Sequence, residues 1–128
     1  MTRHDLTPLA RSVAPNATAA EAEAARWLSQ SDRPEALILS NGLMLMGAVR
    51  AARTLALRVP GDLALAGFDN EPWTDLVEPG LTVIEQPVAE IGAQAMRLLF
   101  ERIESPDQPV RKVTLSGRAV LRGSTRRG

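Results

Sequence analysis

The chain has no cysteine and a single histidine, His4, among its 128 residues. Without cysteine it can form neither disulfides nor thiolate sites, and a lone histidine in an irregular lead-in is more typical of the surface than of catalysis. No Gly-x-Ser-x-Gly elbow, Walker loop or dinucleotide fingerprint occurs, and no cluster has the spacing of metal ligands. The sequence therefore predicts no enzyme, no metal site and no cofactor.

An excess of charge of one sign is also missing, because fifteen basic residues balance fifteen acidic ones. Domains that hold DNA through its phosphates normally carry a basic excess, and the basic end at 122–127 is most simply a solvated tail. No apolar run approaches the roughly 20 residues of a membrane helix, and the first residues lack a signal-peptide core. These absences indicate a cytoplasmic protein that alone binds neither membranes nor, tightly, DNA.

Helical and extended patterns alternate along the rest of the chain. An irregular lead-in over 1–17 is followed by a predicted helix, which Thr18 and Glu21 would open as a capping box. The patterns beyond it predict strand 36–39, helix 42–55, strand 63–68, short helix 72–77, strand 81–84, helix 88–103, and a last strand or hairpin within 110–121. This order predicts an α/β domain over 18–125, with a parallel sheet flanked by helices and a tail at 126–128.

The helix expected over 42–55 has almost no polar face. A helix that is apolar all round must be covered on more than one side, and in a small chain a subunit interface is a natural second cover. We therefore expect a homodimer formed through this helix, with Leu43, Met46, Ala48 and Arg50 at the interface.

Polar residues follow two of the expected strands directly. Asn41 comes after the first strand and Asp69 after the second, so both lie at the edge of the sheet formed by the carboxyl ends of the strands. Ligands of parallel sheets bind beyond this edge. A carboxylate and a carboxamide suit ligand hydroxyls, and Trp73 offers a flat face for a sugar ring. Each residue also has a purely structural interpretation: Asn41 as a helix cap, Asp69 as a turn stabiliser and Trp73 as part of the core.

Three stretches carry longer motifs: Arg58-Val-Pro-Gly-Asp-Leu-Ala-Leu-Ala-Gly-Phe-Asp-Asn70, Pro79-Gly-Leu-Thr-Val-Ile-Glu-Gln-Pro87 and Arg118-Ala-Val-Leu-Arg-Gly-Ser-Thr125. In their order and spacing they resemble the carboxyl-terminal half of LacI/GalR-type regulators, over roughly residues 15–125. The resemblance implies a periplasmic-binding-protein-like (type I) fold, with two lobes and a sugar cleft between them. This chain would supply an incomplete carboxyl-terminal lobe.

The resemblance also assigns site residues. Asn41 and Asp69 match positions that hydrogen-bond the effector's hydroxyls, Trp73 matches a pocket edge, and Gln86 matches a supporting position near the cleft. Gly42 stands where many members have aspartate. This departure removes one carboxylate from the cleft edge, which could suit an anionic effector such as a sugar phosphate.

The function that the resemblance implies is that of a sugar-responsive transcriptional repressor. The intact protein would bind a sugar or sugar phosphate, and would bind DNA only through a domain absent from this chain. Because one wall of the cleft is present, we expect weak or no sugar binding by the chain alone. A periplasmic sugar-binding protein of a transporter shares the fold and is one alternative. An isolated protein-interaction module is another.

Overall fold

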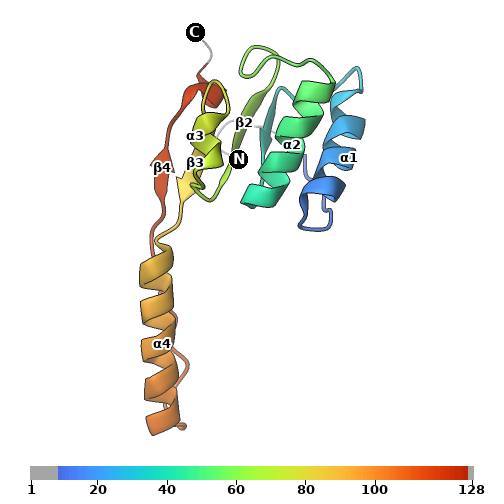
Figure 1. Cartoon of the computed structure of the whole chain (residues 1–128). Helices are drawn as coiled ribbons and strands as arrows, with labels where there is room; N and C mark the ends of the chain where they lie inside the picture. The colour runs from blue at the N-terminus through green and yellow to red at the C-terminus, as the bar shows by residue number, and fades with distance from the viewer. Residues whose placement is uncertain (1–8, 127–128) are drawn as a thin grey trace.

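The computed structural model describes residues 9–126, in which helices and strands alternate as the sequence predicts (Figure 1). The elements are α1 (Ala17–Leu28), β1 (Ala36–Ile38), α2 (Gly42–Thr54), β2 (Ala64–Phe68), α3 (Trp73–Leu76), β3 (Thr82–Glu85), α4 (Val88–Glu104), β4 (Arg118–Val120) and a 3-10 turn (Gly123–Thr125). His4, the first half of the lead-in and the last two residues of the tail lie outside the described residues.

The four strands form one open sheet in the order β1-β2-β3-β4. The prediction of a parallel sheet is confirmed for β1, β2 and β3. The fourth strand runs antiparallel to β3, with Arg118 opposite Glu85. Its direction is reversed because the segment that runs back along α4 re-enters the sheet at the end from which β3 left it. The strand signal at 110–115 forms no strand, so the last strand is confined to three residues.

The helix α1 begins earlier than expected, and Asn16 caps it in place of Thr18. The extended backbone of Asn16 lets its Oδ1 accept a hydrogen bond from the amide of Ala19 at 2.9 Å. Asparagine is among the strongest N-caps, and here it satisfies one of the free amides of the first turn. The capping box predicted at Thr18 is therefore wrong.

The second cover of α2 comes from the same chain, because α1 packs against it. A Cβ built on Gly47 would lie 2.4 Å from the carbonyl oxygen of Ala17, so the two helices approach at backbone distance. Ala48 is fully buried and has no surface to offer another subunit, which removes it from the expected interface. The face of α2 that stays open carries the other three expected interface residues: Leu43, Met46 and Arg50.

The core lies between the sheet and these helices. Leu37, Leu65 and Val83 come from the three parallel strands and are buried on one face. On the same face Gly67 leaves room for Leu45 of α2, since a Cβ there would lie 2.9 Å from a leucine methyl. The strands follow one another across the sheet in sequence order, so right-handed crossovers place their connecting helices on a single face.

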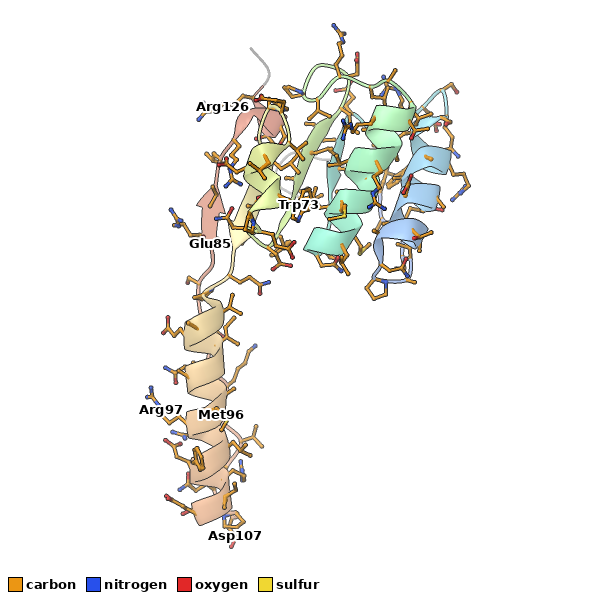
Figure 2. The ribbon with its side chains drawn as sticks, in the orientation of Figure 1. Trp73, Glu85, Met96, Arg97, Asp107 and Arg126 are labelled. Carbon is orange, nitrogen blue, oxygen red and sulfur yellow. The ribbon has the colours of Figure 1, made fainter. Side chains whose placement is uncertain are left out.

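The helix α4 leaves this core and stands away from the sheet (Figure 1). None of its 17 residues is buried, although its apolar stripe predicts a covered face; Phe100 is 58% exposed. Residues 105–117 run back along it, held by Arg102, whose guanidinium donates to the carbonyls of Pro106 and Gln108. We call residues 88–117 the arm and the remaining described residues the body. Figure 2 shows Met96 and Arg97 projecting from the arm and Asp107 at its tip.

The last residues of the body are integrated into it. Ser124 is fully buried; its hydroxyl donates to the Leu65 carbonyl at 2.6 Å and accepts from the Thr82 amide at 2.8 Å. Arg122, with a side chain only 16% exposed, donates to three acceptors: the Leu81 carbonyl, Thr74 Oγ1 and Asn70 Oδ1. The solvated tail predicted to begin at Arg122 is therefore wrong at that residue.

Candidate functional site

Asn41 follows β1 and caps α2, as its structural interpretation predicts. Its Oδ1 accepts a hydrogen bond from the amide of Met44 at 2.8 Å. No described residue accepts a hydrogen bond from its Nδ2, so the amide group remains able to donate to a ligand. The cap holds the side chain still and leaves its donor end free.

Asp69 follows β2 and connects the ends of all three parallel strands. Its backbone adopts the left-handed conformation, with φ at 73°, which aspartate tolerates better than most residues. Its Oδ2 accepts from the Gly42 amide at 3.3 Å, and its Oδ1 accepts from Gln86 Nε2 at 2.7 Å. A carboxylate has about four acceptor positions, so Asp69 keeps capacity for a ligand, and Gln86 supports it as expected.

Trp73 opens α3 and is half-buried against the core. Its indole Nε1 donates to Glu71 Oε2 at 2.6 Å. Trp73 thus contacts the core with part of its side chain and leaves the rest exposed at the carboxyl ends of the strands. Figure 2 shows Trp73 and Glu85 toward the end of the body from which the arm leaves, the end to which Asn41 and Asp69 also belong.

Glu71 is a residue of this edge that the sequence analysis did not identify. A Cβ built on Gly42 would lie only 3.1 Å from Glu71 Oε1. The carboxylate expected to be missing at position 42 is therefore supplied from the loop between β2 and α3. In the sequence Glu71 stands out only as one of four acidic residues from Asp69 to Glu78, and such a stretch equally fits a solvated loop.

Behind the edge, Asn70 links two ion pairs. Its Nδ2 donates to Glu85 Oε1 at 2.8 Å, and its Oδ1 accepts from Arg122 at 2.8 Å. The hydrogen bond from Asn70, followed by the one from Arg118, holds the pKa of Glu85 below its ordinary value. These arginines are thus engaged away from the edge, whereas Asp69 and Glu71 form no ion pair with any described residue.

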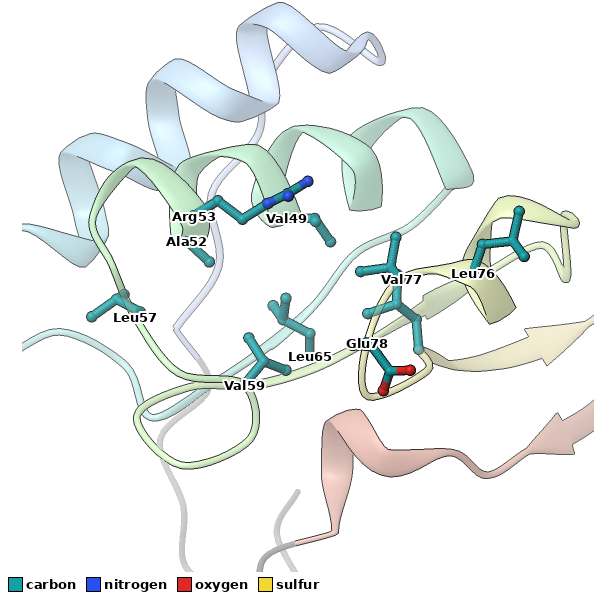
Figure 3. A pocket seen from close by; sticks show the side chains of 10 residues that line it. Val49, Ala52, Arg53, Leu57, Val59, Leu65, Leu76, Val77 and Glu78 are labelled. Carbon is teal, nitrogen blue, oxygen red and sulfur yellow. The ribbon is translucent and has the colours of Figure 1, made fainter.

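A hollow of about 370 Å³ lies at the opposite end of the strands, near the amino ends of β2 and β3 (Figure 3). Leu57 and Val59, which precede β2, form part of its wall. Its lining is apolar apart from the side chains of Arg53 and Glu78, and ligand sites normally bring several polar groups together. The polar strand ends are therefore the better candidate site.

Within residues 9–126 no three acidic, histidine or cysteine side chains are grouped so that they could hold a metal ion. No helix there is both long enough and apolar enough to cross a membrane.

The sequence matches the family model of the periplasmic binding protein-like domain over residues 1–125. It is 36% identical over 102 residues to the HTH-type transcriptional repressor PurR of Mannheimia succiniciproducens, which covers 80% of this chain and 30% of the repressor. It is 38% identical over 90 residues to the HTH-type transcriptional regulator MalR of Streptomyces coelicolor, which covers 70% of this chain and 26% of the regulator.

Three solved structures similar to this chain are also of transcriptional regulators or repressors. A LacI family regulator from Arthrobacter sp. FB24 in complex with lactose has a TM-score of 0.74 at 31% identity, covering 89% of this chain and 43% of that one. A LacI family regulator from Enterococcus faecium with bound ribose has a TM-score of 0.74 at 25% identity, covering 88% and 41%. A dimeric Lac repressor has a TM-score of 0.82 at 26% identity, covering 97% and 46%.

The sheet, its helices and the polar strand ends define a domain of the periplasmic-binding-protein-like type. Within that class the chain belongs to the LacI family of transcriptional regulators, and it corresponds to part of their effector-binding domain. It spans less than a third of the length of the two curated relatives.

Proposed function

We propose that this chain belongs to a cytoplasmic LacI-type regulator, in which it forms one wall of a sugar-binding site and also contacts a second subunit. The observation that carries the proposal is the arrangement around Asp69, whose carboxylate is held by Gly42 and Gln86 at the ends of neighbouring strands. Similar regulators solved with lactose and with ribose support a sugar as the ligand class.

The edge offers both kinds of hydrogen-bonding group that a sugar hydroxyl needs. Asn41 Nδ2 can donate to a hydroxyl oxygen, and the open positions of the Asp69 carboxylate can accept a hydroxyl hydrogen. The face of Trp73 can lie against the apolar side of the ring. Because protein hydrogen bonds already fix Asn41 and Asp69, little side-chain order remains to be gained on binding.

In the proposed regulator, the sugar changes DNA affinity without touching DNA. Binding favours one arrangement of the effector-binding domain over another, and DNA affinity follows this shift in population. DNA contact is assigned to another domain, because this chain carries no net charge. The repressors among its relatives favour this function over a transport protein, an isolated interaction module or an enzyme.

An NMR titration of the 128-residue chain with lactose and ribose tests the site. The sequence alone allows weak or no binding by this chain, but because Asn41 and Asp69 are already held in place, we expect weak, millimolar binding. It should shift the amides of Gly42 and Asp69 and the indole resonance of Trp73. Asp69→Asn should abolish these shifts, because it weakens the acceptor that Gly42 and Gln86 hold. Shifts confined to other parts of the chain, or none with either sugar, would refute the proposal. Micromolar binding would contradict the expectation of a single cleft wall.

For the subunit contact, we propose the open stripe of α2 formed by Leu43, Met46 and Arg50. The dimeric state of the similar Lac repressor supports it. Sedimentation of the chain at increasing concentration should show dimers, and Leu43→Glu should shift them to monomers, because a charge would be buried at the contact. A strictly monomeric chain would rule this interface out.

A further inference from the structure

Glu71 places a carboxylate beside the first residue of α2. A Cβ on Gly42 would lie 3.1 Å from Glu71 Oε1 and 3.3 Å from its Cδ, so the carboxylate fills the space beside the glycine. The other oxygen, Oε2, is held by the indole of Trp73 at 2.6 Å. Glu71 is therefore an oriented carboxylate, and no described residue donates a hydrogen bond to its Oε1.

Asp69 and Glu71 together surround Gly42 with negative charge. The amino end of α2 offsets only about half a charge, and the Gly42 amide already donates to Asp69. Arginines of the carboxyl-terminal segment do not neutralise the pair. Arg118 contacts Glu85, and Arg122 donates to Asn70 and pairs with Asp75.

We propose that Glu71 determines the specificity of this site for neutral, hydroxyl-rich ligands over anionic ones; the inference rests on the sugar site proposed above. A hydroxyl that donates to Glu71 gains a charge-assisted hydrogen bond. A phosphate or carboxylate placed there meets two like charges and is repelled. The ligand class is thus a neutral polyhydroxyl compound, and not the anionic effector that Gly42 alone suggests.

The test compares ribose with ribose 5-phosphate, which share the sugar and differ in charge. Both are titrated into the chain and into Glu71→Gln, and binding is followed through the Gly42 amide and the Trp73 indole. Glutamine keeps the size of the side chain and an acceptor for the indole, but removes the charge. Wild-type chain should prefer ribose, and the variant should reduce that preference at least about fivefold.

Glu78→Gln is the matched control, because it removes the same charge from a residue of the distant hollow. It should leave the preference for ribose unchanged. An equal reduction in both variants would show that net charge, and not the position of Glu71, sets the preference, and would overturn the inference.

The remaining outcomes separate this inference from the proposed function. If ribose shifts Gly42 and Trp73 but Glu71→Gln keeps the preference, the specificity role fails and the sugar site stands. If wild-type chain prefers ribose 5-phosphate, the specificity role also fails. If neither compound shifts the site resonances of the wild-type chain, both the site and the inference are refuted.

Discussion

The body and the arm carry apolar residues in similar patterns, but only the body covers them. In the body Leu45, Leu63 and Leu65 have no exposed surface, whereas in the arm Phe100 and Ile103 are more than half exposed. Both regions have the sequence signature of a helix with an apolar face. Periodicity therefore predicts that a helix has an apolar face but does not identify what lies against that face.

The arm is held by contacts within itself. Arg102 reaches the carbonyls of the returning segment, and Arg111 pairs with Glu101. Helices in proteins derive most of their stability from tertiary packing, and exposed ion pairs contribute little. We therefore expect the body to unfold cooperatively and the arm to open far more easily.

Hydrogen exchange should show the largest difference between the two regions. Amides of α2 and β2 are expected to exchange at least about a thousand-fold more slowly than amides of α4, because core opening approaches global unfolding. Mass spectrometry of deuterated peptides measures this. Equal protection in α4 and α2 would mean that the arm is covered in solution, for example by a second copy of the chain.

Truncation of one leucine in each region should separate their stabilities. Leu65→Ala removes a fully buried side chain and should cost about 2–5 kcal/mol of unfolding free energy. Leu99→Ala, at a side chain 51% exposed, should cost less than about 0.5 kcal/mol. Urea denaturation of both variants gives the values, and a large cost for Leu99→Ala would show that the arm packs against something.

A smaller difference is expected for two serines. Ser124→Ala leaves the Leu65 carbonyl and the Thr82 amide without their hydroxyl partner, which should cost about 1–3 kcal/mol. Ser105→Ala, at the end of α4, removes a side chain with no hydrogen bond to a described residue and should be nearly neutral. Thermal unfolding of both variants tests this. If Ser124→Ala were neutral, residues 122–125 would not contribute to the stability of the body.

The smallest effect concerns acid stability. Hydrogen bonds from the Arg58 side chain and amide hold the pKa of Asp62 far below its ordinary value. A lowered folded-state pKa contributes stability that is complete above the ordinary aspartate pKa of about 3.9 and is lost as the pH falls toward the lowered one. Asp62→Asn should therefore reduce the loss of stability between pH 4 and pH 2. Asp107→Asn in the arm is the control, and equal curves for Asp62→Asn and wild type would contradict the expectation.

Local signals predicted much of the body and, within the candidate site, pointed to Asn41, Asp69 and Trp73. Asn41 and Asp69 were proposed because each comes just after an apolar run, and the carboxyl ends of neighbouring parallel strands then bring them together. Glu71 and Arg122 were missed for a different reason. Glu71 depends on an absent side chain elsewhere, and Arg122 reaches acceptors more than 40 residues away in the chain.

Two features of the fold were unpredictable for similar physical reasons. The pattern of α2 required a second cover but could not distinguish a neighbouring helix from another subunit, since both bury the same apolar surface. The direction of β4 was also open, because a three-residue strand has the same alternation in either direction. Only the path of the returning segment decides it.

Glu85 and Arg118 face each other as the last and first residues of adjacent antiparallel strands. The chain thus leaves the sheet at Glu85 and re-enters it directly opposite, at Arg118. The 32 residues between Glu85 and Arg118 lie outside the sheet. Antiparallel neighbours can be joined by a tight turn of two residues. Topologically, the arm is an insertion into a β-hairpin, and a short turn could replace it without rerouting any strand of the sheet.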